Sequence, residues 1–255
     1  MTLKMPTLGP ISIRIASTMP STNTYRQPIG APLPGWTIRA LPIPSHLAGR
    51  FCRLEPLDAV RHAEELYTAY SQAPDGQDWT YMPVGPFATL ADYRAHAEQA
   101  VAAPGFLHYA VIDLRTGRAV GTLALMRMDA ANGVIEVGFV AFSALLKRTP
   151  ASTEAQFLLM QHAFDSLGYR RFEWKCDNLN APSMLAAKRL GFQFEGVFRQ
   201  AVVYKARNRD TAWFSIISPE WPALRTAFLQ WLAADNFDAQ GQQRQSLAQL
   251  RSLSI

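Results

Sequence analysis

The chain has 255 residues, 49% of them apolar, with 14 Phe and 6 Trp, which can fill a sizeable core and excludes a disordered protein. Its net charge of +5 comes from residues 1–50, which hold five basic and no acidic residues; the other 205 residues carry 20 of each sign, so a nucleic-acid partner is not expected. No apolar run reaches the length of a membrane helix, and the first 30 residues have no secretory core, so we expect a cytoplasmic protein without a membrane partner.

The first half of the chain is predicted to alternate strands and helices behind a leader. Residues 1–35 are expected to be a flexible, Pro-rich leader, because prolines stand among Ser, Thr and Gly with no periodicity. Asp58 and Thr89 are predicted to cap two helices, and Thr116 and Gly117 to turn a hairpin. The expected elements are a strand at 51–57, helices at 59–71 and 89–103, an aromatic loop at 71–87 between them, and strands at 107–114 and 119–128.

The segment 134–142, VIEVGFVAF, is predicted to be a buried strand with one polar intrusion. Alternate residues of a strand point to opposite faces, so its side chains divide into two sets. One set contains Ile135, Val137 and Phe139, and the other contains Glu136, Gly138 and Val140. A plain core strand is the alternative to a strand that also lines a site.

The segment 146–155, LKRTPASTEA, joins this strand to a helix expected from about Ala151 to Gly168. Thr149 is the predicted N-cap, and Pro150 suits the first helical position. First-turn amides have no intrahelical acceptor and the helix dipole adds positive charge, so this turn could hold a phosphate. The groups available are the amides of Ala151, Ser152 and Thr153 and the side chains of Lys147 and Arg148. Against this, most helix starts bind only water or a cap.

The rest of the chain continues the alternation and ends in a helical extension. The expected elements are a strand at 172–176, a short helix at 181–190 capped by Asn180, strands at about 192–198 and 211–217, and a helix at 221–232. Strands flanked by helices indicate a mixed α/β (α+β) domain, predicted at 36–218. The extension at 219–255 carries an apolar helix that could serve a homodimer. Cys52 and Cys176 have no partner motif, so neither a disulfide nor a metal site is expected.

Three motifs stand in the order typical of one family. They are E-x-G at Glu136–Gly138, R-x-x-A-x-T at Arg148–Thr153, and N-x-x-S at Asn180–Ser183 followed by Gly191 and Phe192. With the order of elements, they resemble the GNAT superfamily of acetyl-CoA-dependent N-acetyltransferases, and its ribosomal-protein N-acetyltransferase branch in particular. The resemblance covers about residues 50–218. It implies a mixed, mostly antiparallel sheet of six to seven strands, flanked by helices and splayed between its fourth and fifth strands.

The resemblance implies transfer of an acetyl group from acetyl-CoA to a primary amine, by direct attack in a ternary complex and without a metal. The acceptor would be a small amine or the N-terminus of a protein or peptide. An alkyl amine must lose a proton to react, and Glu136 is the expected base. Ser183 is the expected acid for the leaving thiolate, mainly as a hydrogen-bond donor, with Tyr204, from a late loop, as the alternative. The plainer interpretations are a solvated edge carboxylate and an ordinary first-turn serine. A noncatalytic acyl-CoA-binding regulatory module is the alternative function.

Cofactor contacts also follow from the resemblance. The pantetheine arm would lie along Phe139, Val140 and Phe142, with Asn178 and Asn180 beside it. The diphosphate would contact Lys147, Arg148, Ala151, Ser152 and Thr153. Ala151 and Thr153 replace small residues of the family pattern and Pro150 lacks an N–H, which leaves less room and one donor fewer for the phosphates.

Acceptor specificity is expected from the aromatic loop, through Trp79, Tyr81 and Phe87, with Tyr204 and Arg207 opposite. The alternative is that these aromatic side chains only form the small core of their own loop. Because loop shape decides the acceptor in such folds, the sequence does not name the amine.

Overall fold

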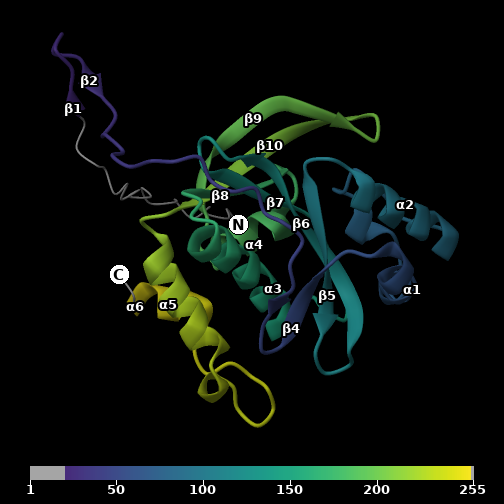
Figure 1. Ribbon diagram of the computed structural model, residues 1–255. Helices are drawn as coiled ribbons and strands as arrows, with labels where there is room; N and C mark the ends of the chain where they lie inside the picture. The colour runs from purple at the N-terminus through teal and green to yellow at the C-terminus, as the bar shows by residue number, and fades with distance from the viewer. Residues whose placement is uncertain (1–20, 254–255) are drawn as a thin grey trace, which may run out of the picture. The chain divides into compact units, whose positions relative to one another are not determined.

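The computed structural model describes residues 21–253, in two units (Figure 1). The described part of the first unit, which ends at Thr37, contains a short antiparallel hairpin of β1 (Ser21–Thr22) and β2 (Pro28–Ile29). Residues 1–20 of the predicted leader lie outside the described residues. The other described elements belong to the unit that begins at Ile38.

One eight-stranded sheet organises this second unit. Its strands are β3 (Leu47–Ala48), β4 (Cys52–Pro56), β5 (Phe106–Asp113), β6 (Arg118–Asp129), β7 (Val134–Phe142), β8 (Arg171–Asp177), β9 (Gln193–Tyr204) and β10 (Arg207–Ile217). Their order in space is β3-β4-β5-β6-β7-β8-β10-β9, and each neighbouring pair is antiparallel except β7 and β8, which are parallel. The expectation of six to seven strands is wrong, because β3 has only two residues and shows no alternating pattern.

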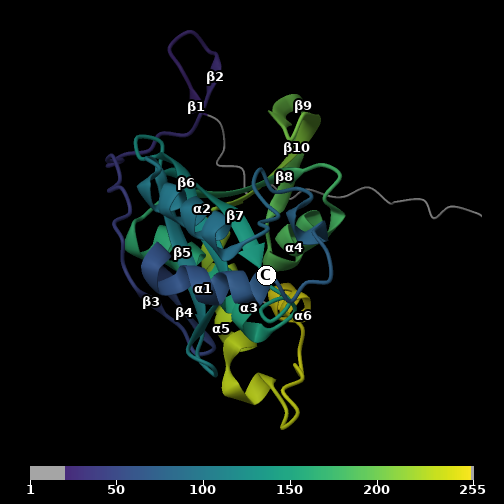
Figure 2. The ribbon, with the colours of Figure 1, turned by 90° about the vertical axis from the view of Figure 1, so that its right-hand side faces the viewer.

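Helices cover both faces of the sheet (Figures 1 and 2). On one face, α1 (Ala59–Tyr70) and α2 (Leu90–Ala102) share a core with alternate residues of β5. On the other face, the remaining β5 residues pack with α3 (Pro150–Gln161), its π-helical continuation η2 (His162–Ser166) and α5 (Trp221–Leu232). The remaining described helical elements are η1 (Gln77–Trp79), α4 (Ala181–Leu190), η3 (Ala234–Asn236) and α6 (Leu247–Leu253).

Side-chain caps begin four helices at the residues that the sequence predicts. Asp58, Thr89, Thr149 and Asn180 each stand at the N-cap, where their side chains accept backbone N–H groups of the first turn. Gly191 ends α4 with a φ of 105°, in the left-handed region that glycine tolerates. These caps fix where α3 and α4 begin after β7 and β8.

α5 closes the core on the α3 side of the sheet. The rings of its Trp221 and Phe228 pack on Phe157 of α3, with centroids 6.0 and 5.3 Å apart, and all three side chains are buried. The apolar face that suggested a dimer surface is thus covered by α3 of the same chain. The homodimer itself stays a prediction.

β9 and β10 form a longer hairpin than the sequence predicts. β9 extends to Tyr204 and β10 begins at Arg207, so Tyr204, expected in a loop, ends a strand. Lys205 and Ala206 make the turn with φ of 48° and 56°, as a tight hairpin turn requires. The prediction missed this part because Lys205 and the polar run 207–210 interrupt the apolar alternation.

Candidate active site

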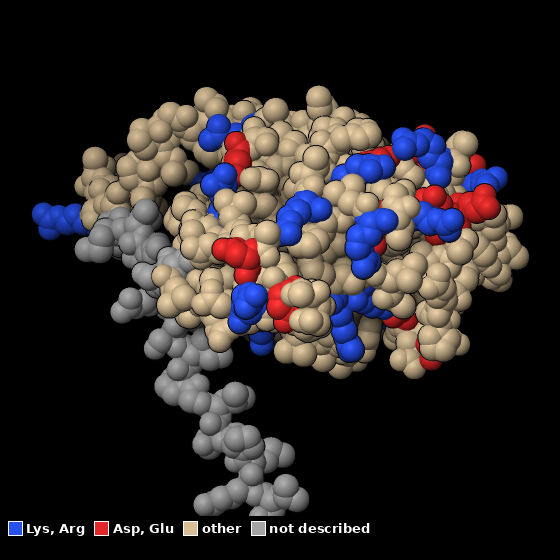
Figure 3. Space-filling model, turned by 90° about the horizontal axis from the view of Figure 1, so that it is seen from below, with Lys and Arg blue, Asp and Glu red and all other residues tan. Residues whose placement is uncertain are grey.

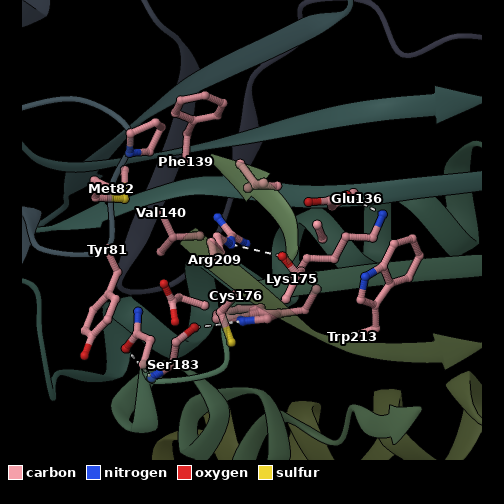
Figure 4. A pocket seen from close by; sticks show the side chains of 18 of the residues that line it. Tyr81, Met82, Glu136, Phe139, Val140, Lys175, Cys176, Ser183, Arg209 and Trp213 are labelled. Atoms are coloured by element: carbon pink, nitrogen blue, oxygen red, sulfur yellow. Dashed lines mark hydrogen bonds and ion pairs between the residues drawn. The ribbon is translucent and has the colours of Figure 1, made fainter. Parts of the chain in front are cut away.

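A pocket of about 470 Å³ lies between β7 and β8. These strands pair through Val134–Val137 and Arg171–Trp174, and the pocket is lined by the residues that end this ladder and those that follow it. β6, the β9–β10 hairpin, the start of α4 and residues 81–83 supply the other walls. Figure 4 shows Glu136, Lys175 and Trp213 gathered at one end of the pocket, away from Tyr81 and Met82.

A β-bulge interrupts β7 beside the pocket. Thr122 and Ala124 of β6 pair with Ala141 and Gly138, so β7 has one extra residue between the two pairs. Phe139 lies in this bulge and has a φ of 49°, which non-glycine residues rarely adopt. One inserted residue exchanges the two faces of the strand beyond it.

The bulge corrects the predicted facing of β7. Phe139 packs against the rings of Phe106 and His108, 5.5 and 5.3 Å away, on the α2 side. Val140 and Phe142 instead pack against the main core. The alternation that places Phe139 with Val137 is therefore wrong from Phe139 onward. Phe139 and Val140 both line the pocket, and Phe142 does not.

Glu136 lies on the pocket side of β7, before the bulge, as the alternation predicts. Its side chain is 4% exposed, so it is not a solvated edge carboxylate. Its Oε2 accepts a hydrogen bond from Lys175 Nζ at 2.8 Å and lies 3.4 Å from Arg127 Nε. Burial raises the pKa of Glu136 above its ordinary value, and the two cations oppose this effect without cancelling it. A buried carboxylate with a raised pKa is suited to accept a proton near neutral pH.

Ser183 and Asn180 line the pocket from the first turn of α4. Asn180 Oδ1 accepts the backbone N–H of Ser183 at 3.2 Å, as a helix cap. Ser183 Oγ accepts the indole N–H of Trp174 at 3.0 Å. This contact fixes the hydroxyl oxygen. Asn178, also predicted to bind the cofactor, does not line the pocket, and its backbone N–H donates to the carbonyl of Asp210 at 2.8 Å.

Tyr204 faces the pocket from the end of β9. Its phenol donates a hydrogen bond to Asp177 Oδ2 at 2.8 Å. Burial, and next this hydrogen bond and charge, raise the pKa of Tyr204 to about 12. The phenol is therefore protonated at neutral pH and does not act as a base.

The predicted phosphate turn lies outside the pocket. Ala151 and Thr153 are buried, and Thr153 Oγ1 accepts a hydrogen bond from Arg189 at 2.9 Å. The N–H of Ser152 is directed to its cap, Thr149. Lys147 forms an ion pair with Asp78 of the aromatic loop. Arg148 is exposed in a left-handed conformation, with a φ of 61°.

The aromatic loop at 71–87 divides between core and pocket. Trp79 and Phe87 pack edge to face, 5.2 Å apart, in the core of the loop, and neither lines the pocket. Tyr81 lines the pocket, and its phenol donates to the carbonyl of Leu179 at 3.1 Å. Opposite, Arg207 of β10 donates to the carbonyl of Thr80 at 2.8 Å. The β9–β10 hairpin thus holds the loop against the pocket.

Comparison with known proteins identifies the family. The family model described as an acetyltransferase (GNAT) domain matches residues 52–193. The chain belongs to the GNAT acetyltransferase family. The crystal structure of a GCN5-related N-acetyltransferase from Brucella melitensis is similar to this GNAT chain at 50% identity and a TM-score of 0.85, covering 86% of this chain and 100% of that one.

Two further relatives are more distant. The crystal structure of a probable GNAT-family acetyltransferase from Chromobacterium violaceum ATCC 12472 is 41% identical, with a TM-score of 0.71 over 77% of this chain and 98% of that one. Uncharacterized N-acetyltransferase p20 of Bacillus licheniformis is 28% identical over 144 residues, which are 55% of this chain and 80% of that protein. This GNAT protein is accordingly an acyltransferase.

The sequence prediction missed several pocket residues of this GNAT domain, among them three charged residues and a tryptophan that lie around the predicted acids. These four are Arg127, Lys175, Asp177 and Trp213. The available signal was the strand RFEWKCD at 171–177, in which charged and apolar residues alternate and the two central charges, Glu173 and Lys175, have opposite signs. Two charges on one face of a buried strand indicate a compensated polar site. The partner in β7 could not be identified without the strand pairing.

The surface of the GNAT domain carries charges of both signs. On the face of residues 38–253 shown in Figure 3, basic and acidic side chains are interspersed. Among the described residues, no helix is long and apolar enough to cross a membrane. In the same part of the chain, no group of three or more His, Cys, Asp or Glu could hold a metal ion.

Proposed function

We propose that this enzyme transfers an acetyl group from acetyl-CoA to a primary amine, by direct attack in a ternary complex. The observation that supports this most is Glu136, a buried carboxylate with a raised pKa that faces a pocket between the parallel strands β7 and β8. The proposed acceptor is a small amine or the N-terminus of a protein or peptide. The ribosomal-protein branch and the cytoplasmic location remain predictions.

The residues of the pocket fit the pantetheine end of acetyl-CoA. The paired ladder of β7 and β8 includes Val137 and Trp174 as its last residues, and the bulged segment that follows on β7 lines the pocket. We infer that the strands splay there and that Phe139 and Val140 would hold the pantetheine arm. GNAT enzymes generally use acetyl-CoA, which supplies a thioester-activated acetyl group.

The start of α3 fits the diphosphate less well. Arg148 is exposed and offers a cation, whereas Lys147 is already paired with Asp78. Pro150 has no N–H, and the N–H of Ser152 is directed to Thr149. We therefore expect Arg148 and the remaining first-turn amides to bind the diphosphate, and Lys147 to contribute only after leaving Asp78.

Three side chains would divide the proton transfers. Glu136 would take the proton that the acceptor amine must lose, because a protonated amine has no lone pair to attack with. The Oγ of Ser183 accepts from Trp174, and its own O–H would donate a hydrogen bond to the leaving thiolate of CoA. Tyr204 keeps its proton at neutral pH, and it would act as a second donor once its hydroxyl group turns from Asp177.

Thiol release from acetyl-CoA, measured with a panel of small amines and peptides, tests this proposal. Glu136→Gln should lower kcat about a hundredfold to ten-thousandfold, while calorimetry shows unchanged CoA binding. Glu55→Gln is a matched control, because Glu55 is also buried and hydrogen-bonded but does not line the pocket. Unchanged turnover in Glu136→Gln would refute the base assignment. No thiol release with any amine would refute the function.

A further inference from the structure

We propose that Lys175 is a positioning residue for Glu136, holding one carboxylate oxygen and keeping the group ionised so that the other oxygen can take the proton. This inference rests on the proposed role of Glu136 as the base. It adds a residue from β8 to a site that the family motif places on β7.

Lys175 is held on three sides. Its Nζ lies 2.8 Å from Glu136 Oε2 and 2.7 Å from Glu173 Oε2. The same Nζ lies 3.7 Å from the centre of the Trp213 ring, which caps the ammonium from β10 (Figure 4). The Lys175 side chain is only 6% exposed. An ammonium fixed by two carboxylates and an aromatic face has little freedom to turn away from Glu136.

The charges facing Glu136 come from two neighbouring strands. From β6, Arg127 Nε approaches Oε2 at 3.4 Å, but the Arg127 side chain is 58% exposed and its charge is screened by water. From β8 come Lys175 and Glu173, and Arg171 Nε contacts Glu173 Oε1 at 2.6 Å. Lys175 is therefore the buried cation with the strongest effect on Glu136. Asp177 and Arg209 also line the pocket.

Both cations contact the same oxygen of Glu136. Lys175 and Arg127 approach Oε2, so Oε1 is the oxygen that we assign to proton uptake. Burial alone would favour the protonated acid, which cannot act as a base. The Lys175 charge favours the carboxylate and lowers the pKa of Glu136 toward its ordinary value, while burial keeps it raised. The contact with Lys175 thus sets both the proton affinity and the orientation of the Glu136 carboxylate.

The test is the pH dependence of kcat/KM in Lys175→Gln. Loss of the cation should raise the pKa of Glu136, so the acid limb should move up by about one to three pH units. At pH values below the pKa of Glu136, kcat/KM of the variant should be lower than that of the parent by about tenfold for each pH unit of the shift. At pH values well above the shifted pKa, kcat/KM of the variant should largely return to that of the parent. Lys175→Arg keeps the charge and should leave the limb near that of the parent. Arg225→Gln, which breaks an ion pair between α5 and Asp165 of η2, neither of which lines the pocket, should not move it.

Two further measurements separate this inference from the proposed function. An NMR titration of the Glu136 carboxyl carbon, without substrate, should report the higher pKa in Lys175→Gln directly. In the Glu136→Gln background, Lys175→Gln should have no further effect on the pH profile. An unmoved limb and an unmoved NMR titration in folded Lys175→Gln would overturn the positioning role. If Glu136→Gln itself keeps full activity, the base assignment fails first.

Discussion

At the residue scale, Glu136 and Tyr204 show how burial acts on two acids of one pocket. Burial raises the pKa of both groups, because it disfavours the charged form. Two cations oppose this effect at Glu136, whereas the neighbouring Asp177 carboxylate reinforces it at Tyr204. The carboxyl group thus binds a proton more readily than an ordinary glutamate, and the phenol keeps its proton at neutral pH.

Tyr204→Phe should lower kcat/KM about tenfold to a hundredfold if the phenol donates in the reaction. Because the pKa of Tyr204 is raised to about 12, the phenol stays protonated throughout the range from about pH 6 to 10. The pH profiles of parent and variant, measured over this range, should therefore have the same shape and differ only in height. An alkaline limb present in the parent and absent from Tyr204→Phe would contradict this assignment.

The sequence predicts which way a side chain faces where the alternation of residues along one strand decides it. Glu136 faces the pocket as expected, and Ser183 and Tyr204 line the same pocket from other elements. Lys175 was missed because its contact with Glu136 depends on how β7 pairs with β8. Trp79, Phe87 and Tyr81 are all aromatic residues of the same loop, so the sequence does not distinguish them. Packing places only Tyr81 in the pocket wall.

At the scale of single elements, Gly138 lies next to the bulge in β7, and its lack of a side chain leaves room for a residue of β6. A Cβ at this position would lie 2.2 Å from Met126 Sδ of β6, and Met126 also lines the pocket. The room beside Gly138 is therefore filled by a methionine thioether.

Gly138→Ala should weaken CoA binding about tenfold, because Met126 must move into the pocket and overpacking costs about 1–3 kcal/mol. Calorimetry with CoA measures the change. Gly30→Ala is the control, since a Cβ there meets nothing within 4 Å. Equal CoA affinity in Gly138→Ala and the parent would show that Met126 does not shape the binding surface.

Helix starts were the elements best predicted, because one capping side chain and the first turn carry the whole signal. The bulge at Phe139 was not predicted, since an extra residue leaves the apolar pattern unchanged and appears only in the pairing with β6. The turn at 205–206 was missed for a related reason. Its left-handed residues are Lys and Ala rather than the Gly or Asn that mark such turns.

At the scale of the whole molecule, α5 belongs to the same core as the sheet. The sequence prediction separates residues 219–255 as an extension, because a helix at the end of a chain has no following strand to mark its packing. Phe228 is fully buried and contacts Phe157 of α3. The main core thus includes side chains from both sides of the predicted boundary.

Phe228→Ala should destabilise the protein by about 3–5 kcal/mol, through lost burial and the cavity left behind. Its neighbour on α5, Leu229, is 44% exposed, and Leu229→Ala should cost under about 1 kcal/mol. Urea unfolding followed by tryptophan fluorescence gives both values. Similar costs for the two variants would mean that α5 is not part of the cooperative core.

The parallel ladder between β7 and β8 gives the Glu136–Lys175 ion pair a second consequence. Lys175 directly follows Trp174, the last residue of β8 in that ladder, and Glu136 directly precedes Val137, its last residue in β7. The ion pair thus joins β7 to β8 at the end of their paired ladder. A substitution of Lys175 that removes its ammonium group would raise the proton affinity of Glu136. It would also allow β7 and β8 to separate more easily at that end of the ladder. The proton affinity of Glu136 and the stability of the β7–β8 pairing would then change together in this enzyme. Substitutions of Lys175 could therefore not alter one without the other.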